Sequence, residues 1–182
     1  RIIVVLHFVR SALGTQTSPP NQVLIGIALF LTLFIMAPVM TQINKDCIQP
    51  YDKGKLTQEE ALNAGLKPIR KFMFEQTNRK DIRLFMEIEK QSNDVSIEKE
   101  DEIPTLVLIP AFMISELRIA FIIGFLIYLP FIVIDMVVAS TLMSMGMMML
   151  PPTTISMPFK ILLFVLADGW NLVIGQLVKT FY

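Results

Sequence analysis

Long runs of apolar residues occupy both ends of the chain, and the middle mixes apolar and polar positions at helical spacing. Val23–Met40 contains no charged residue, and Leu117–Ala139 is interrupted only by Arg118 and Asp135. A helix needs about 20 apolar residues to cross a bilayer. Phe159–Val178 is a third apolar stretch, and no stretch alternates in the manner of a β-strand. The pattern predicts an all-α, membrane-associated protein.

Two double prolines divide the apolar parts of the chain. Pro19-Pro20 and Pro151-Pro152 each lie between two apolar segments and are each followed by polar residues. Gly14, shortly before the first pair, is a typical helix stop. We expect each proline pair to form the turn of a bent helical hairpin.

Three further features of the apolar segments affect where their helices end. Pro38 lies near the end of the first long segment and is expected to bend or stop its helix. Pro130 predicts a bend within the second long segment, and Phe159–Val178 is expected to form one final helix. Ile2–Val9 is apolar but too short to span a membrane.

The middle of the chain carries most of its charge. Residues 41–102 hold 11 of the 16 Lys and Arg residues and 13 of the 16 Asp and Glu residues. We therefore predict one domain over 1–182, made of an apolar hairpin (1–40), a polar, solvent-exposed helical insert (41–102) and a second apolar hairpin (103–182).

Cap signals divide this insert into helices. Thr57 and Glu60 have the spacing of a capping box, which predicts a short helix as far as Gly65. Pro68 favours the first turn of a second helix, and the helical pattern continues through Ile82 to about Lys90. Residues 92–102 are acidic and rich in turn formers, which indicates a mobile loop.

Composition excludes several classes of protein. The net charge is zero and no segment is strongly basic, which argues against nucleic-acid binding. With a single cysteine, a lone His7 and no catalytic motif, we expect no disulfide framework, no metal site, no cofactor and no enzymatic activity. Because the chain starts at Arg1 inside an apolar run, we expect that the natural N-terminus, with any signal peptide, is missing.

Methionines concentrate just before the second proline pair. Five of the 12 methionines fall within seven residues, at Met143, Met145, Met147, Met148 and Met149. Flexible, polarizable thioethers can close a pore and still deform around varied cargo. The same run is compatible with packing filler at a helix end, or with a copper-binding run that lacks neighbouring His or Cys ligands.

Five charged residues lie within or directly next to the last two apolar segments: Glu116, Arg118, Asp135, Lys160 and Asp168. Such charges are costly in lipid, so they should face protein or water. Glu116 and Arg118 point to different sides of a helix and should pair with other elements or chains. Lys160 and Asp168 are eight residues apart and can share one helix face. Ion pairs between elements or subunits are the structural interpretation, and a proton relay is the functional one.

Several runs of residues resemble the FliP family of the flagellar type III export gate, which is related to the SctR proteins of injectisomes. The similarity covers essentially the whole chain. It rests on RSALG (10–14) with PPNQ (19–22), LFLTLFIMAPV (29–39), PAFMISEL (110–117), FIVIDMVVASTLMSMGMMML (131–150) with Pro151-Pro152, and PFKILLFVLADGW (158–170).

The resemblance implies a function that composition does not reveal. It implies five copies that form, with FliQ-like and FliR-like partners and an FlhB-like switch protein, a channel for unfolded flagellar proteins in the bacterial inner membrane, at the flagellar basal body. It also implies that Met147, Met148 and Met149, with Met145 beside them, form a gasket, that Glu116 lies at a subunit contact, and that the insert is periplasmic. The alternative is a small-solute or ion transporter that uses Asp135, Lys160 and Asp168.

Overall fold

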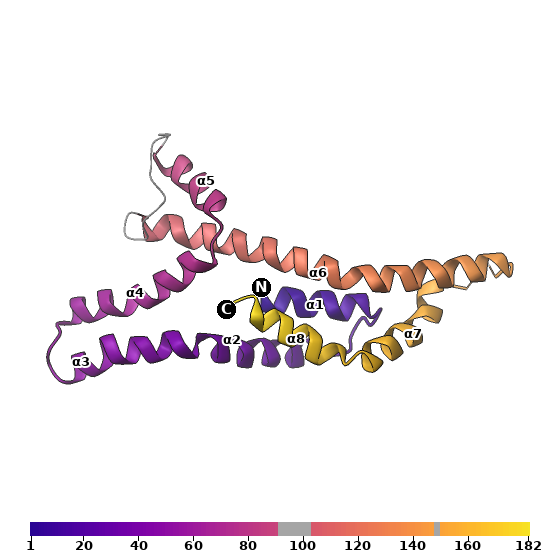
Figure 1. The fold of residues 1–182 in the computed structure, drawn as a ribbon, viewed down its shortest axis with the longest axis horizontal. Coiled ribbons are helices and arrows are strands. Elements are labelled where there is room, and N and C mark those ends of the chain that lie inside the picture. Colours follow the sequence, from indigo (N-terminus) through magenta and orange to yellow (C-terminus); the bar gives the residue numbers. More distant parts are fainter. Residues whose placement is uncertain (91–102, 148–149) are drawn as a thin grey trace. The chain divides into compact units, whose positions relative to one another are not determined.

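A computed structural model describes residues 1–90, 103–147 and 150–182. Helices contain 83% of these residues and none of them lies in a strand, which confirms the all-α fold (Figure 1). The elements are α1 (Ile2–Ala12), α2 (Asn21–Ile43), the π-helix η1 (Asn44–Ile48), α3 (Gln49–Asp52), α4 (Gln58–Gln76), α5 (Arg79–Lys90), α6 (Thr105–Ser144), α7 (Pro152–Leu166) and α8 (Gly169–Lys179). The predicted acidic loop at 92–102 lies outside the described residues.

Within the residues that the structure describes, two helical segments are long and apolar enough to cross a membrane. They are Asn21–Asp52, which comprises α2, η1 and α3, and α6, and the bent pair of α7 and α8 could form a third. Only 11% of the most apolar window of either segment is buried within the chain. These surfaces suit a lipid environment or neighbouring chains, and they agree with the predicted membrane association.

The chain forms two compact units. Arg1–Thr32 and Ile119–Tyr182 make the first, called here the hairpin unit, and Leu33–Arg118 makes the second, called here the insert unit. The hairpin unit packs α1 against α6, α7 and α8 through Val9, Ala12, Leu13, Phe131 and Phe164. The division of the chain into 1–40, 41–102 and 103–182 remains a prediction.

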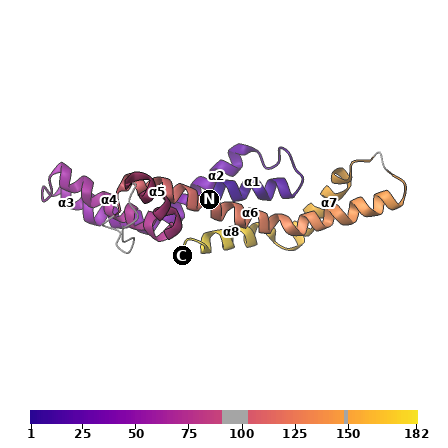
Figure 2. The same ribbon diagram turned by 90° about the horizontal axis from the view of Figure 1, so that it is seen from above.

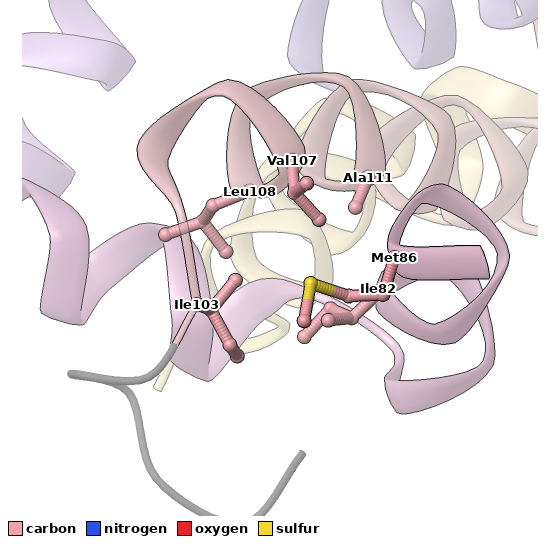
Figure 3. Packing of buried hydrophobic residues seen from close by; sticks show 6 residues of the cluster. All are labelled: Ile82, Met86, Ile103, Val107, Leu108 and Ala111. Atoms are coloured by element: carbon pink, nitrogen blue, oxygen red, sulfur yellow. The ribbon is translucent and has the colours of Figure 1, made fainter. Parts of the chain in front are cut away.

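The core of the insert unit joins α5 to the first turns of α6. Its buried side chains are Ile82 and Met86 from α5, with Ile103, Val107, Leu108 and Ala111 (Figure 3). Arg70 of α4 adds a polar connection, because its guanidinium donates to the carbonyl oxygen of Ile103 at 2.6 Å and to the hydroxyl of Thr105. The helix end predicted near Lys90 is confirmed, but the predicted continuous helix from Pro68 to Lys90 is wrong, because α4 ends at Gln76 and α5 begins at Arg79.

The predicted break between Gly65 and Pro68 is wrong, because α4 is one helix from Gln58 to Gln76. Gly65 instead accommodates the packing of α4 on η1: a Cβ there would lie 3.3 Å from the sulfur of Cys47. The capping box at Thr57 and Glu60 starts this helix as predicted. Pro38 also fails to stop its helix, since α2 continues to Ile43.

The prediction of one helix over Phe159–Val178 is also wrong. The chain bends by 65° between α7 and α8. Asp168 has φ +49°, in the left-handed region, and Gly169 follows it. A Cβ on Gly169 would lie 2.3 Å from the ring of Phe164, so the close return of the chain needs glycine at this position.

Candidate functional site

Asp135 and Lys160 form an ion pair inside the hairpin unit. The Lys160 Nζ lies 2.6 Å from Asp135 Oδ2, and the hydroxyl of Ser156 donates to Asp135 Oδ1 at 2.5 Å. Ser156 and Lys160 are four residues apart on α7, so both reach the same carboxylate on α6. The Lys160 side chain is only 3% exposed, and a buried amine of this kind requires a counter-ion.

Asp168 does not belong to this cluster. The expectation that it shares a helix face with Lys160 is wrong, because the helix breaks at Asp168. Asp168 is exposed, and its carboxylate accepts a hydrogen bond from the side-chain amide of Asn171 at 3.0 Å. Asp135, Lys160 and Asp168 therefore do not form one continuous chain of ionisable groups.

Arg118 pairs with a residue of the insert unit that sequence reasoning missed. Its Nη2 lies 2.6 Å from Oδ1 of Asp81 on α5. The Ser115 hydroxyl donates to Asp81 Oδ2 at 2.6 Å and accepts from the backbone N–H of Asn78 at 2.9 Å. Glu116 is buried on α6 and does not supply this carboxylate. As predicted, Arg118 has its partner on another element.

The turn between α6 and α7 carries the methionine run, and in Figure 2 the chain reverses there. The N–H of Met147 donates to Leu142 O at 3.0 Å, and that of Gly146 donates to Met143 O at 3.1 Å. With Gly146 at φ +74°, this pattern is a Schellman cap that ends α6. Met145 follows the last residue of the helix, and Met148 and Met149 lie outside the described residues.

The methionines of this turn are exposed wherever the structure describes them. The exposed fractions are 63% for Met143, 71% for Met145 and 47% for Met147. Side chains that filled a core within this chain would be buried. The described part of the run therefore presents thioethers outward.

Both proline pairs lie between helices. Pro20 precedes α2, and its carbonyl accepts from the N–H of Val23 at 3.0 Å and of Leu24 at 3.2 Å. Pro19 lies just before it. Pro151 is the N-cap of α7 and Pro152 is its first residue, where proline loses no helical hydrogen bond.

No group of three His, Cys, Asp or Glu side chains that could hold a metal ion occurs in the part of the chain that the structure describes. In each of the two ion pairs described above, a serine hydroxyl donates a second hydrogen bond to the carboxylate. Their geometry fixes helices relative to one another within each unit.

Comparisons with known proteins identify the family. A sequence model of the FliP family matches residues 1–177. The chain is 55% identical to the flagellar biosynthetic protein FliP of Bacillus subtilis over 181 residues, all of this chain and 80% of the relative. The FliP proteins of Pectobacterium carotovorum and of a Buchnera aphidicola strain are 48% and 50% identical over all of this chain, which spans 69% and 50% of their lengths. These matches confirm the predicted resemblance, and this chain belongs to the FliP family.

Proposed function

We propose that this chain is a channel-forming subunit of the flagellar protein export apparatus. Family membership supports a role in flagellar biosynthesis, in a component that is not an enzyme. The exposure of Met143, Met145 and Met147 at one turn carries the more specific proposal that this turn constricts a channel.

Large exposed thioethers at a turn need another surface to cover them. Copies of the same turn arranged around an axis would cover each other. Methionine suits such a ring because its three rotatable bonds allow the constriction to close and then to deform around an unfolded chain. We assign this gasket role to Met145, Met147, Met148 and Met149.

The remaining apolar surface suggests where the partners bind. The two spanning-length helices bury little of their surface within the chain, and this leaves it for lipid and for neighbouring subunits. We propose five copies with FliQ-like, FliR-like and FlhB-like partners, located in the inner membrane at the flagellar basal body. Residues 41–102 then lie on the periplasmic side, and unfolded flagellar proteins pass through the channel.

Alanine at Met145, Met147, Met148 and Met149 tests the gasket. We expect cells that carry the full-length variant complex to admit small solutes that wild-type cells exclude, because shorter side chains leave the constriction open. Uptake of a small dye into these cells measures the leak. Size-exclusion chromatography of the purified complex checks that it assembles.

Met136→Ala is the matched control. Met136 lies on α6, outside the turn, and is 64% exposed, so it loses the same thioether from a similarly exposed position. The control should leave the permeability barrier intact. An assembled four-alanine complex that excludes the dye as well as wild type would refute the gasket role.

A further inference from the structure

Residues 143–147, called here the methionine turn, present sulfur atoms at the surface of the chain. Met143, Met145 and Met147 are 63%, 71% and 47% exposed, whereas Met86 in the core of the insert unit is 2% exposed. Methionine thioethers are common targets of oxidation, and an oxidant has to reach the sulfur atom before it can react. Exposure therefore makes the methionine turn a candidate site of chemical modification.

Exposure alone does not distinguish this turn from the rest of α6. Met113 and Met136 also lie on α6 and are 56% and 64% exposed. Both are inside a regular helix that is long and apolar enough to cross a membrane, so lipid or a neighbouring subunit can cover their side chains. An oxidant dissolved in water reaches the methionine turn more readily than these two residues only if the turn meets water.

The length of α6 and the backbone beyond it favour water around the methionine turn. α6 has 40 residues and is about 60 Å long, whereas the hydrocarbon layer is about 30 Å thick, so part of this helix lies outside the layer. Its long apolar stretch ends at Ala139, and the exposed hydroxyl residues Ser140, Thr141 and Ser144 follow. After Ser144 the chain leaves the helix, and non-helical backbone does not face lipid, because its polar groups would lose their hydrogen bonds.

Hydrogen peroxide oxidises a thioether without any further reactant. A lone pair of the sulfur attacks one peroxide oxygen, and the O–O bond breaks as the S–O bond forms. The hydroxide that leaves takes the proton from the new S–OH group and becomes water, so the sulfur loses two electrons and the peroxide gains them. The product is a polar sulfoxide, which methionine sulfoxide reductases convert back to the thioether.

We propose that Met143, Met145 and Met147 form a peroxide-reactive site at which reversible oxidation opens the constriction. Apolar constrictions close a channel by excluding water. A sulfoxide gives each of these side chains a polar oxygen that accepts hydrogen bonds from water, so the oxidised turn no longer excludes it. The reaction with peroxide requires only that the turn meets water, whereas the effect of oxidation on the channel rests on the proposed function.

Oxidation of the full-length protein in its purified complex tests the site. The complex is treated with dilute hydrogen peroxide, and tandem mass spectrometry locates each added oxygen atom over time. We expect the three methionines of the turn to be oxidised severalfold faster than Met113 and Met136, because lipid or subunits cover those two. Unfolding the complex in guanidinium before the treatment should remove the difference. Equal rates for the turn and for Met113 and Met136 in the folded complex would overturn the proposal.

Release of a small dye from vesicles that contain the complex tests the effect on the channel. The wild-type complex should release the dye after peroxide treatment, and methionine sulfoxide reductases should restore the barrier. Leucine at all five methionines of the run keeps apolar side chains of similar size without sulfur, so this variant should stay closed after peroxide. Leucine at Met40, Met113 and Met136, which are exposed outside the turn, is the matched control and should leak like the wild type.

A wild-type complex that is oxidised at all three methionines of the turn and still holds the dye would refute the proposed regulation. The complex with alanine at Met145, Met147, Met148 and Met149 then separates two explanations. If that complex leaks, the gasket exists and oxidation does not open it. If it holds the dye, the gasket role itself is wrong. Size-exclusion chromatography checks that each variant complex assembles.

Discussion

Among the described residues, a carboxylate in the hairpin unit and another in the insert unit each bind a serine hydroxyl and a cation, but the two ion pairs bury opposite partners. In the hairpin unit Lys160 is 3% exposed and Asp135 is 29% exposed. In the insert unit Asp81 is 3% exposed and the side chain of Arg118 is 46% exposed. Losing the partner of a buried charge costs more than losing the partner of a solvated one. The two pairs should therefore respond to substitution in opposite orders.

Asp135→Asn is expected to have the largest effect on stability. It leaves the amine of Lys160 buried without an anion, and breaking a buried pair in this way costs about 3–5 kcal/mol. Lys160→Met removes the buried charge and leaves Asp135 partly exposed, with its hydrogen bond from Ser156, so it should cost only about 1–2 kcal/mol. The midpoint of thermal unfolding of the purified complex compares the two variants.

The double variant of Asp135→Asn and Lys160→Met controls for changes in side-chain shape. It leaves no unpaired charge and should recover much of the loss caused by Asp135→Asn alone. Equal costs for the two single variants would contradict the proposed asymmetry. The alternative function makes a different prediction. A double variant that is stable and assembled but no longer carries a small solute or ion would show that these charges act in transport, in favour of the transporter function.

Substitutions in the insert unit should show the reverse order, with a smaller effect. Arg118→Met leaves the buried carboxylate of Asp81 with Ser115 as its remaining side-chain donor, at a cost of about 2–3 kcal/mol. Asp81→Asn leaves a guanidinium that is nearly half exposed and an amide oxygen that still accepts from Ser115, so about 1 kcal/mol is expected.

Hydrogen exchange of the backbone amides of α5 measures this local effect, because the pair connects α5 to α6. Arg118→Met should speed exchange there more than Asp81→Asn does. If Asp81→Asn destabilises α5 more, the burial of the carboxylate does not set the cost, and the comparison between the two units fails.

Uninterrupted apolar runs predicted the long helices and helical spacing predicted those of the insert, whereas local stop signals gave several helix ends wrongly. Gly65 and Pro68 are typical of a helix boundary, but α4 continues through both residues and lies against Cys47 at Gly65. Phe159–Val178 lacks an internal proline, yet the chain breaks at Asp168 because Gly169 lets it return against Phe164. In both places tertiary contacts decide the outcome, and these are not encoded in the periodicity of one segment.

Charged site residues were predictable, whereas their partners were not. Asp135, Lys160 and Arg118 are conspicuous in apolar segments, because an ionisable group there needs a partner. Asp81 is hidden among many charges of the insert. Its position four residues before Phe85, on the apolar side of α5, is the signal that could have identified it. Ser156 could similarly have been found four residues before Lys160.

The smallest effect is expected at a third carboxylate, which is fully exposed. Glu60 Oε2 accepts from the backbone N–H of Thr57 at 2.8 Å and from its hydroxyl at 2.9 Å. The backbone hydrogen bond first, and then the hydroxyl, lower the pKa of Glu60. Because the folded-state pKa lies below the ordinary value of 4.5, this capping box stabilises α4 fully above that value and loses its effect as the pH falls through the folded-state pKa.

Glu60→Gln should therefore reduce the pH dependence of stability below about pH 5. It leaves no buried charge without a partner. Thermal unfolding of the wild-type and variant complexes from about pH 6 to about pH 3 measures it. Glu59→Gln removes the same charge from the neighbouring position, outside the capping box, and should keep the wild-type pH dependence. If Glu60→Gln lowered stability as much as Arg118→Met does, the exposure of a carboxylate would not determine how much its interactions contribute to stability. The contrast between the two ion pairs would then need another physical cause.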